Sequence, residues 1–213
     1  MKGMSFDGVH TYENLHMVLS QVNIPPATPN TSFIDIPGGD GSVDLTEALG
    51  EVRYSNREGA TFTFTVFPQD DFEEKKRQIS NFLNGKRFER IILDKDPGYF
   101  WMGRCAINEY ASDKNLHKIV VVANLAPYKL KVNQTMLSVP AGENTVITLE
   151  NGRKSVVPTI VCTAPATIVF GAGEHKINAG THVLSNILLK QGDNKLSVTS
   201  EEPVKFIYQE GDL

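Results

Sequence analysis

The sequence predicts a mainly β protein in two parts: an N-terminal α+β domain over residues 1–125 and an all-β domain over residues 126–213. Three observations lead to this prediction. Residues 61–66 alternate apolar and polar side chains, which is typical of a half-buried strand. One convincing helical pattern occurs, between Asp70 and Gly85. After Ala126-Pro127, short apolar segments alternate with turn residues, which favours a β-sandwich.

The first third of the chain predicts extended structure. Leu15 to Leu19 is expected to be a strand, and the prolines between residues 25 and 29 exclude helix and favour an extended crossing. Phe33 to Ile36 is the next expected strand, and Pro37 ends it because proline donates no hydrogen bond to a sheet.

A glycine-rich turn follows, with the sequence Ile36-Pro37-Gly38-Gly39-Asp40-Gly41. Its glycines permit positive φ, so the backbone can reverse tightly there. Asp44 and Glu47 have the spacing of a capping box, which predicts a short helix that stops at Gly50.

The one long helix is predicted to begin with Asp70 as its cap and Glu73 completing the capping box. Phe72, Ile79, Phe82 and Leu83 lie on one face, and Gly85 is a natural residue to follow the last turn. The remaining strands of this part are expected at 90–93, 99–107 and 116–124.

The C-terminal part is expected to contain short strands only. Asn151-Gly152 is a strong signal for a two-residue hairpin. The predicted strands are 129–132, 145–149, 156–162, 167–170, 182–189, 195–198 and 204–208.

Charge and composition exclude several classes of protein. The net charge is -4, and residues 126–213 hold eight basic and eight acidic residues, so the first part carries all of it. We find no basic stripe for nucleic acid and no apolar run long enough for a membrane span. The N-terminus lacks the apolar core of a signal peptide. Cys105 and Cys162 are therefore expected to be reduced core residues.

Candidate sites for chemistry are few, and each has a simpler reading. Asp40 and Asp44 suggest a calcium loop, but the order of ligands and the distal glutamate are missing. Residues 38–41 suggest a phosphate cradle, but no Gly-Lys-Ser/Thr follows. Asp94 and Asp96 suggest paired catalytic carboxylates, although two aspartates at one turn are more often solvated.

Two further possibilities concern ligands. His175 and His182 could meet across a hairpin as a metal pair, but two surface histidines are the better interpretation. Tyr99 and Trp101 could form a platform for a sugar, but their shared face favours the core or a subunit interface. We expect no catalytic, cofactor-binding or metal-binding residues.

The order of motifs resembles the distal tail protein family of long-tailed bacteriophages, over nearly the whole chain. The matching segments are 6–10, 36–41, 44–46, 54–57, 82–86, 99–104, 151–153, 157–160, 192–194 and 207–213. Many relatives carry Arg where this chain has Gly39, so any subunit contact made by that Arg cannot be carried over.

The resemblance implies a structural protein of the virion tail. Such proteins form a hexameric ring, the distal tail hub, which joins the tail tube to the tail-tip or baseplate proteins. Residues 1–125 would build the ring by strand pairing and apolar contacts. Residues 126–213 would form a galectin-like β-sandwich that projects outward.

The same resemblance gives roles to residues and partners. Ile36, Pro37, Gly38, Asp40, Gly41 and Asp44 would be a signature turn of the ring domain that shapes a subunit contact. Expected partners are further copies of the chain, the tail tube protein, a tail-associated lysin or tail-tip hub, and receptor-binding proteins. The alternative is a carbohydrate-binding adhesion module in residues 126–213.

Overall fold

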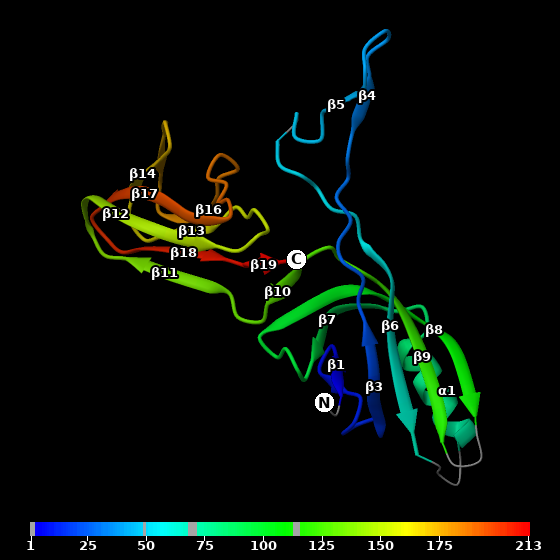
Figure 1. Cartoon of the computed structure of the whole chain (residues 1–213). Helices are drawn as coiled ribbons and strands as arrows, with labels where there is room; N and C mark the ends of the chain where they lie inside the picture. Colours follow the sequence, from blue (N-terminus) through cyan, green and yellow to red (C-terminus); the bar gives the residue numbers. More distant parts are fainter. Residues whose placement is uncertain (1–2, 49, 68–71, 113–115) are drawn as a thin grey trace. The chain divides into compact units, whose positions relative to one another are not determined.

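The computed structural model describes residues 3–48, 50–67, 72–112 and 116–213 of the chain (Figure 1). Two compact units divide the chain, Met1–Pro127 and Tyr128–Leu213, called unit 1 and unit 2 below. The described residues are mainly antiparallel β-strands with one α-helix, which confirms the predicted fold class. No helix in this part of the chain is long and apolar enough to cross a membrane.

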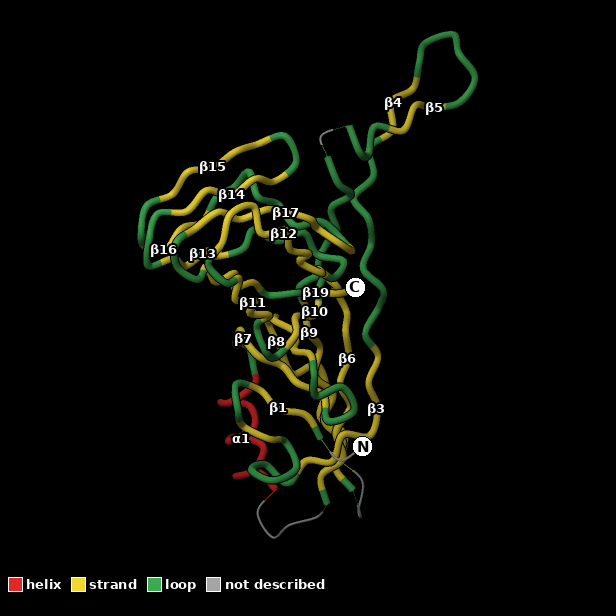
Figure 2. Tube along the Cα trace, turned by 90° about the vertical axis from the view of Figure 1, so that its left-hand side faces the viewer, coloured by secondary structure: helices red, strands yellow, loops and turns green. Residues whose placement is uncertain are grey.

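Unit 1 is built on one antiparallel sheet with the strand order β2-β1-β7-β8-β9-β6-β3. A separate hairpin, β4–β5, lies outside this sheet (Figure 2). The elements are β1 (Met4–Phe6), β2 (Val9–His10), β3 (Met17–Asn23), β4 (Phe33–Asp35), β5 (Ser42–Asp44), β6 (Arg57–Val66), α1 (Phe72–Leu83), β7 (Arg87–Leu93), β8 (Tyr99–Ser112) and β9 (His117–Leu125).

The core of unit 1 lies between α1 and the sheet. In β6 the apolar members of the alternating pattern, Phe62 and Phe64, are fully buried, as the period of two requires. Ile79 and Leu83 of α1 are also fully buried. Phe6 and Phe62 meet edge to face with ring centroids 6.5 Å apart. The sheet and the helix therefore share one aromatic-rich core.

Unit 2 contains two four-stranded antiparallel sheets, ordered β11-β18-β13-β16 and β12-β17-β14-β15, and the short pair β10–β19. Buried side chains from both sheets, such as Phe206 and Leu196, form one apolar cluster, so the unit is a β-sandwich. Its strands are β10 (Lys129–Lys131), β11 (Thr135–Val139), β12 (Gly142–Asn151), β13 (Thr159–Cys162), β14 (Ala166–Phe170), β15 (Gly173–Ile177), β16 (Gly180–Val183), β17 (Gly192–Ser200), β18 (Val204–Tyr208) and β19 (Gly211–Asp212).

A polar cluster fixes the C-terminal strands of unit 2. The Tyr208 hydroxyl donates a hydrogen bond to the Glu150 carbonyl oxygen. Burial, with a smaller effect of Glu210 and Glu150, raises the pKa of Tyr208 to about 12. The buried Glu210 carboxylate lies 2.8 Å from the Lys131 ammonium group and also accepts a hydrogen bond from Thr135. These contacts tie β10, β12 and β18 together.

Three local predictions are wrong. The strand predicted at 182–189 does not form beyond Val183, where β16 ends. Residues 44–48 form no helix, since Asp44 ends β5 and residues 46–48 form a turn. A segment this short cannot offset the cost of helix nucleation when Ser42–Asp44 can pair with Phe33–Asp35 instead. Asn151-Gly152 does not join two paired strands, because β12 pairs with β17. The predicted cap at Asp70 lies outside the described residues.

Candidate functional site: an exposed arm

The most distinctive feature of unit 1 is a two-stranded extension between β3 and β6, residues 28–55, called the arm below. It stands clear of the sheet and ends in the β4–β5 hairpin (Figure 1). Every residue from 28 to 45 is exposed. The arm holds five acidic residues and one basic residue, whereas the rest of unit 1 holds twelve of each. The arm therefore carries the whole net charge of the unit.

Hydrogen bonds join the two chain segments of the arm along its length. The amide of Ser55 donates to the carbonyl of Thr28 over 2.9 Å, and the amide of Asn30 donates to the carbonyl of Arg53 over 2.8 Å. Nearer the tip, the amide of Leu45 donates to the carbonyl of Ser32 over 2.8 Å. The arm is thus a continuous ribbon and not a pair of separate loops.

Arg57 anchors the base of the arm, where β6 begins. Its guanidinium group donates to the carbonyl oxygens of Pro25, over 2.7 Å, and Pro127, over 2.9 Å. It also lies 4.8 Å from the ring centre of Trp101. Arg57 is only 7 % exposed, and this burial lowers the pKa of its side chain. Three separate segments are held at the point where the arm leaves the sheet.

The predicted signature turn forms the tip of the arm. β4 ends at Asp35, directly before Ile36 and Pro37. Gly38 and Gly41 both have φ +79°, a left-handed conformation that side chains other than glycine rarely adopt. The backbone conformation of the turn therefore explains why glycine occupies positions 38 and 41.

The two aspartates of the turn segment have different surroundings. Asp40 lies in the turn and makes no side-chain hydrogen bond within the described residues. One Asp44 carboxylate oxygen accepts a hydrogen bond from the Thr46 amide over 2.9 Å. Hydrogen bonds from the side chain and backbone of Thr46 lower the pKa of Asp44. Asp44 therefore stabilises a turn after β5 and is ionised at neutral pH.

The hairpin has two different faces because successive residues in a strand point to opposite sides. Ile34 pairs with Val43 on one face, and these side chains are 53 % and 43 % exposed. Phe33 and Asp35 lie on the other face, together with Asp44. Apolar side chains in such an exposed position are typical of a surface that contacts another protein.

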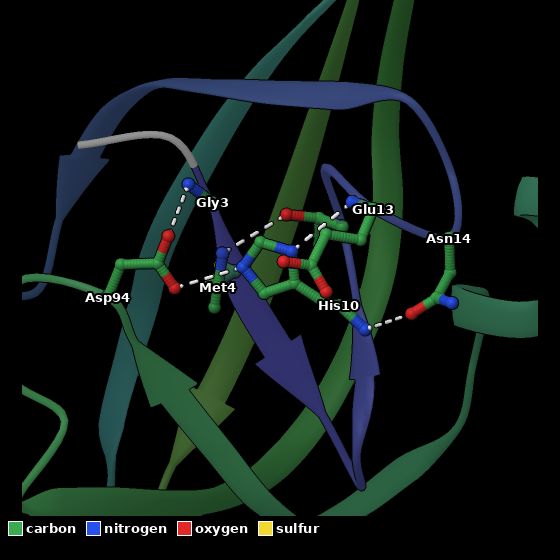
Figure 3. A network of polar contacts seen from close by, with 7 residues as sticks. Gly3, Met4, His10, Glu13, Asn14 and Asp94 are labelled. Atoms are coloured by element: carbon green, nitrogen blue, oxygen red, sulfur yellow. Dashed lines mark hydrogen bonds and ion pairs between the residues drawn. The ribbon is translucent and has the colours of Figure 1, made fainter.

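A polar network at the N-terminus explains the role of Asp94 (Figure 3). One Asp94 oxygen accepts from the Gly3 amide over 2.9 Å, and the other lies 3.0 Å from His10 Nε2. The Glu13 amide is 3.2 Å from His10 Nδ1 and can only donate, so Nδ1 is the acceptor and Nε2 carries the proton. The His10 amide donates to Asn14. Both ring nitrogens are engaged, so the pair is a structural clasp between β2 and the end of β7.

The other candidate ligands are not brought together. Among the described residues, no three His, Cys, Asp or Glu side chains are grouped as metal ligands would be. His175 lies on β15 and His182 on β16, strands of different sheets. Cys105 is buried and free, and burial raises its pKa to about 12. Trp101 is 8 % exposed beneath Arg57, so its ring offers no platform to a sugar.

Unit 2 contains a cavity of about 910 Å³ at one end of the sheet β12-β17-β14-β15. Its polar lining includes Glu143, Thr167, Lys176 and Thr199. No aromatic side chain of the described residues lines it, so the stacking surface typical of sugar sites is absent there.

Sequence reasoning identified the turn at the tip but missed the arm. A strand is predicted at Phe33 and Ile34 but not at Val43, and the exposure of these side chains is not predicted. The available signal was the isolation of this apolar stretch between prolines and glycines, too short to join a larger sheet. The anchoring role of Arg57 had no local signal, because its partners are far away in the sequence.

Comparison with known proteins identifies a solved structure with a similar fold over the whole chain. The crystal structure of the Dit (gp 19.1) protein of phage SPP1 matches with a TM-score of 0.69 at 17% identity, covering 100% of both chains. It is described as a paradigm of the hub adsorption apparatus in phages that infect Gram-positive bacteria. No family model and no curated protein matches the sequence. The resemblance to distal tail proteins is thus confirmed at the level of the fold.

Proposed function

We propose that the chain is a structural component of a long-tailed bacteriophage tail: a hexameric ring, the distal tail hub, that joins the tail tube to the tail-tip or baseplate proteins. The fold likeness over the full length of both chains carries this proposal. The exposed arm supports it, because the apolar side chains of Ile34 and Val43 are open to contact with another copy.

Unit 1 forms the ring in this proposal, and unit 2 is the galectin-like β-sandwich. The apolar face of the arm, Ile34 and Val43, packs on a neighbouring copy. Because the arm and the surface that receives it are different parts of one chain, each copy binds the next head to tail, and such contacts close into a ring when the rotation fits. The signature turn, Ile36 to Gly41, shapes this subunit contact.

The chain acts in this role without catalysis. The His10–Asp94 pair is engaged as a clasp, and Cys105 is a buried thiol held protonated. The protein resides at the distal end of the virion tail after synthesis in the bacterial cytoplasm. Its partners are the tail tube protein, a tail-associated lysin or tail-tip hub, and receptor-binding proteins; nucleic acid and membrane are not among them.

Mass photometry and negative-stain microscopy of the purified chain test the proposal. We expect a ring of six times the 23.5 kDa chain mass, or two such rings stacked. A variant with residues 28–55 replaced by a short Gly-Ser turn serves as the control and should be a folded monomer. A wild-type chain that stays monomeric both alone and with tail tube protein would contradict the ring.

The alternative function is carbohydrate binding by unit 2 during host adhesion. The cavity beside Glu143 and Lys176 is the observation that favours it. A glycan array that includes host cell-wall polysaccharides distinguishes the two functions. Binding that is lost in a Lys176→Ala variant would support adhesion. If no glycan binds, the tail-hub function is the only one of the two that remains.

A further inference from the structure

Unit 1 has a pocket lined by two arginines on adjacent strands. It has a volume of about 340 Å³ and is bordered by Arg87 of β7 and Arg104 of β8. Asn56, Met102 and Asn124 line it as well. We call it the arginine pocket.

The two arginines are direct cross-strand partners in the sheet. Like charges placed directly opposite each other destabilise an antiparallel pair. The Arg87 Nε lies 3.5 Å from a carboxylate oxygen of Glu89, but these side chains are 60% and 64% exposed, so water screens the attraction. Both arginines are exposed, so water screens their repulsion as well, and the group formed by Arg87, Arg104 and Glu89 keeps one uncompensated positive charge.

Both arginines keep hydrogen-bond donors for a further ligand. Arg104 donates one N–H to the carbonyl oxygen of Gly85 over 2.6 Å, and Arg87 has its contact with Glu89. A guanidinium group has five N–H donors in a planar fork that matches a carboxylate. The chemistry of the pocket therefore suits two carboxylates, one for each arginine.

The arm presents two carboxylates at a matching spacing. Asp35 pairs with Ser42, and Asp44 pairs with Phe33, so the two aspartates are diagonal neighbours on one face of the hairpin. Diagonal residues lie about 7–8 Å apart, within the reach of two long side chains that start about 5 Å apart. The Asp35 side chain makes no hydrogen bond or ion pair within the described residues, and Asp44 is ionised.

The two surfaces also agree in charge. The residues of the arm carry a net charge of -4, and the acidic and basic residues in the remainder of unit 1 are equal in number. Within one chain the arm stays extended, held by its ribbon of hydrogen bonds, with its acidic face exposed. The ligand that fits the arginine pocket is therefore the arm of a second copy.

We propose that Asp35 and Asp44 of one chain bind Arg87 and Arg104 of the next chain. This inference rests on the proposed ring and names the charged part of its subunit contact. Phe33, the cross-strand partner of Asp44 on the same face, enters the pocket beside Met102. The opposite face of the hairpin, with Ile34 and Val43, then covers apolar surface elsewhere on the neighbouring copy.

A double-mutant cycle tests this contact. Asp35→Asn with Asp44→Asn removes the arm charges, and Asn at position 44 still accepts from Thr46. Arg87→Gln with Arg104→Gln removes the pocket charges. We expect each pair to raise the concentration for half-assembly at least tenfold. The fourfold variant should be no weaker than either pair, because residues that act on each other are not additive.

The control is Lys195→Gln with Lys205→Gln, which removes two exposed positive charges from unit 2 and should leave assembly unchanged. The docking would be overturned if the effects of the two pairs were additive, or if the chain without the two arginines assembled at the same concentration as the wild type. Either result would leave the proposed ring itself unaffected. A wild-type chain that forms no ring would overturn both.

A second measurement locates the contact directly. Asp35→Cys with Arg104→Cys should give disulfide-linked multimers on oxidation, since the native Cys105 and Cys162 are buried. If the oxidised variant assembles into rings but its subunits carry no disulfide cross-links, the proposed pairing is contradicted.

Discussion

Replacing the apolar face of the arm should weaken assembly without unfolding the chain. The variant is Ile34→Ser with Val43→Ser. These side chains are cross-strand partners, 53 % and 43 % exposed, so about half of each is available for burial by a neighbour. Burying a whole Ile or Val side chain contributes about 1.5–3 kcal/mol, so the exposed halves contribute about 1 kcal/mol each.

The two changes together should cost about 2 kcal/mol of association, or roughly a thirtyfold increase in the dissociation constant for each subunit contact. Sedimentation velocity over a concentration series measures this shift. Circular dichroism of the same samples should show unchanged thermal unfolding, because the two side chains contribute little to either core.

The matched control is Val146→Ser with Val183→Ser. These valines are 71 % and 66 % exposed and belong to unit 2, so the change in polarity is comparable and leaves the arm unaltered. Rings that assemble equally well with and without the apolar face of the arm would refute the reasoning. If only the control variant failed to assemble, the apolar subunit contact would have to lie on unit 2 and not on the arm.

Three further predictions concern the arm and the two cores. Gly38→Val forces a β-branched residue into φ +79°, at a cost of about 1–2 kcal/mol. The hairpin should therefore exchange its amide hydrogens faster, and assembly should weaken. Unchanged exchange and assembly would show that the turn needs no positive φ. Arg57→Gln removes two partly buried hydrogen bonds of a charged group and the contact with Trp101. Urea unfolding should therefore show a loss of about 2–4 kcal/mol, and Arg57→Lys should recover only part of it. Tyr208 has its pKa raised to about 12 in the folded chain, so its contribution to stability is present below about pH 10 and is lost as pH rises to about 12. Tyr208→Phe also removes the bond to Glu150, so it should unfold about 1 kcal/mol more easily at pH 7 and show a weaker decline of stability above pH 10.

The elements with strong periodicity were predictable from the sequence. Thr61–Val66 alternates strictly, and the structure has a strand there, extended to Arg57–Val66. The helical pattern that ends at Leu83 is α1, and Gly85 after it has φ +73°. In these segments the local pattern and the buried face agree, so tertiary context does not override the pattern.

Other elements depend on partners that are remote in the sequence. Asn151-Gly152 is a hairpin signal, but a Cβ on Gly152 would lie 2.8 Å from the carbonyl oxygen of Gly211, so this glycine serves a close packing contact instead. The cap signal at Asp44 was overridden by pairing with Phe33 across the hairpin. Local propensity cannot show which of two competing partners lies nearby in space.

The candidate site was predictable only in part. Gly38 and Gly41 marked the turn, because positive φ depends on the residue itself. The exposure of the arm and the pairing of Arg87 with Arg104 arise from the strand order and register, which no short motif encodes.

The β4–β5 hairpin is a two-stranded sheet whose outer edges both lack a neighbouring strand among the described residues. An isolated hairpin of this kind is marginally stable in water. If the arm docks as proposed, a newly made subunit has complete domain cores and a hairpin that gains most of its stability only on contact with a second molecule. Completion of the fold then depends on subunit concentration, so a tail built from this protein would couple the maturation of each subunit to its incorporation.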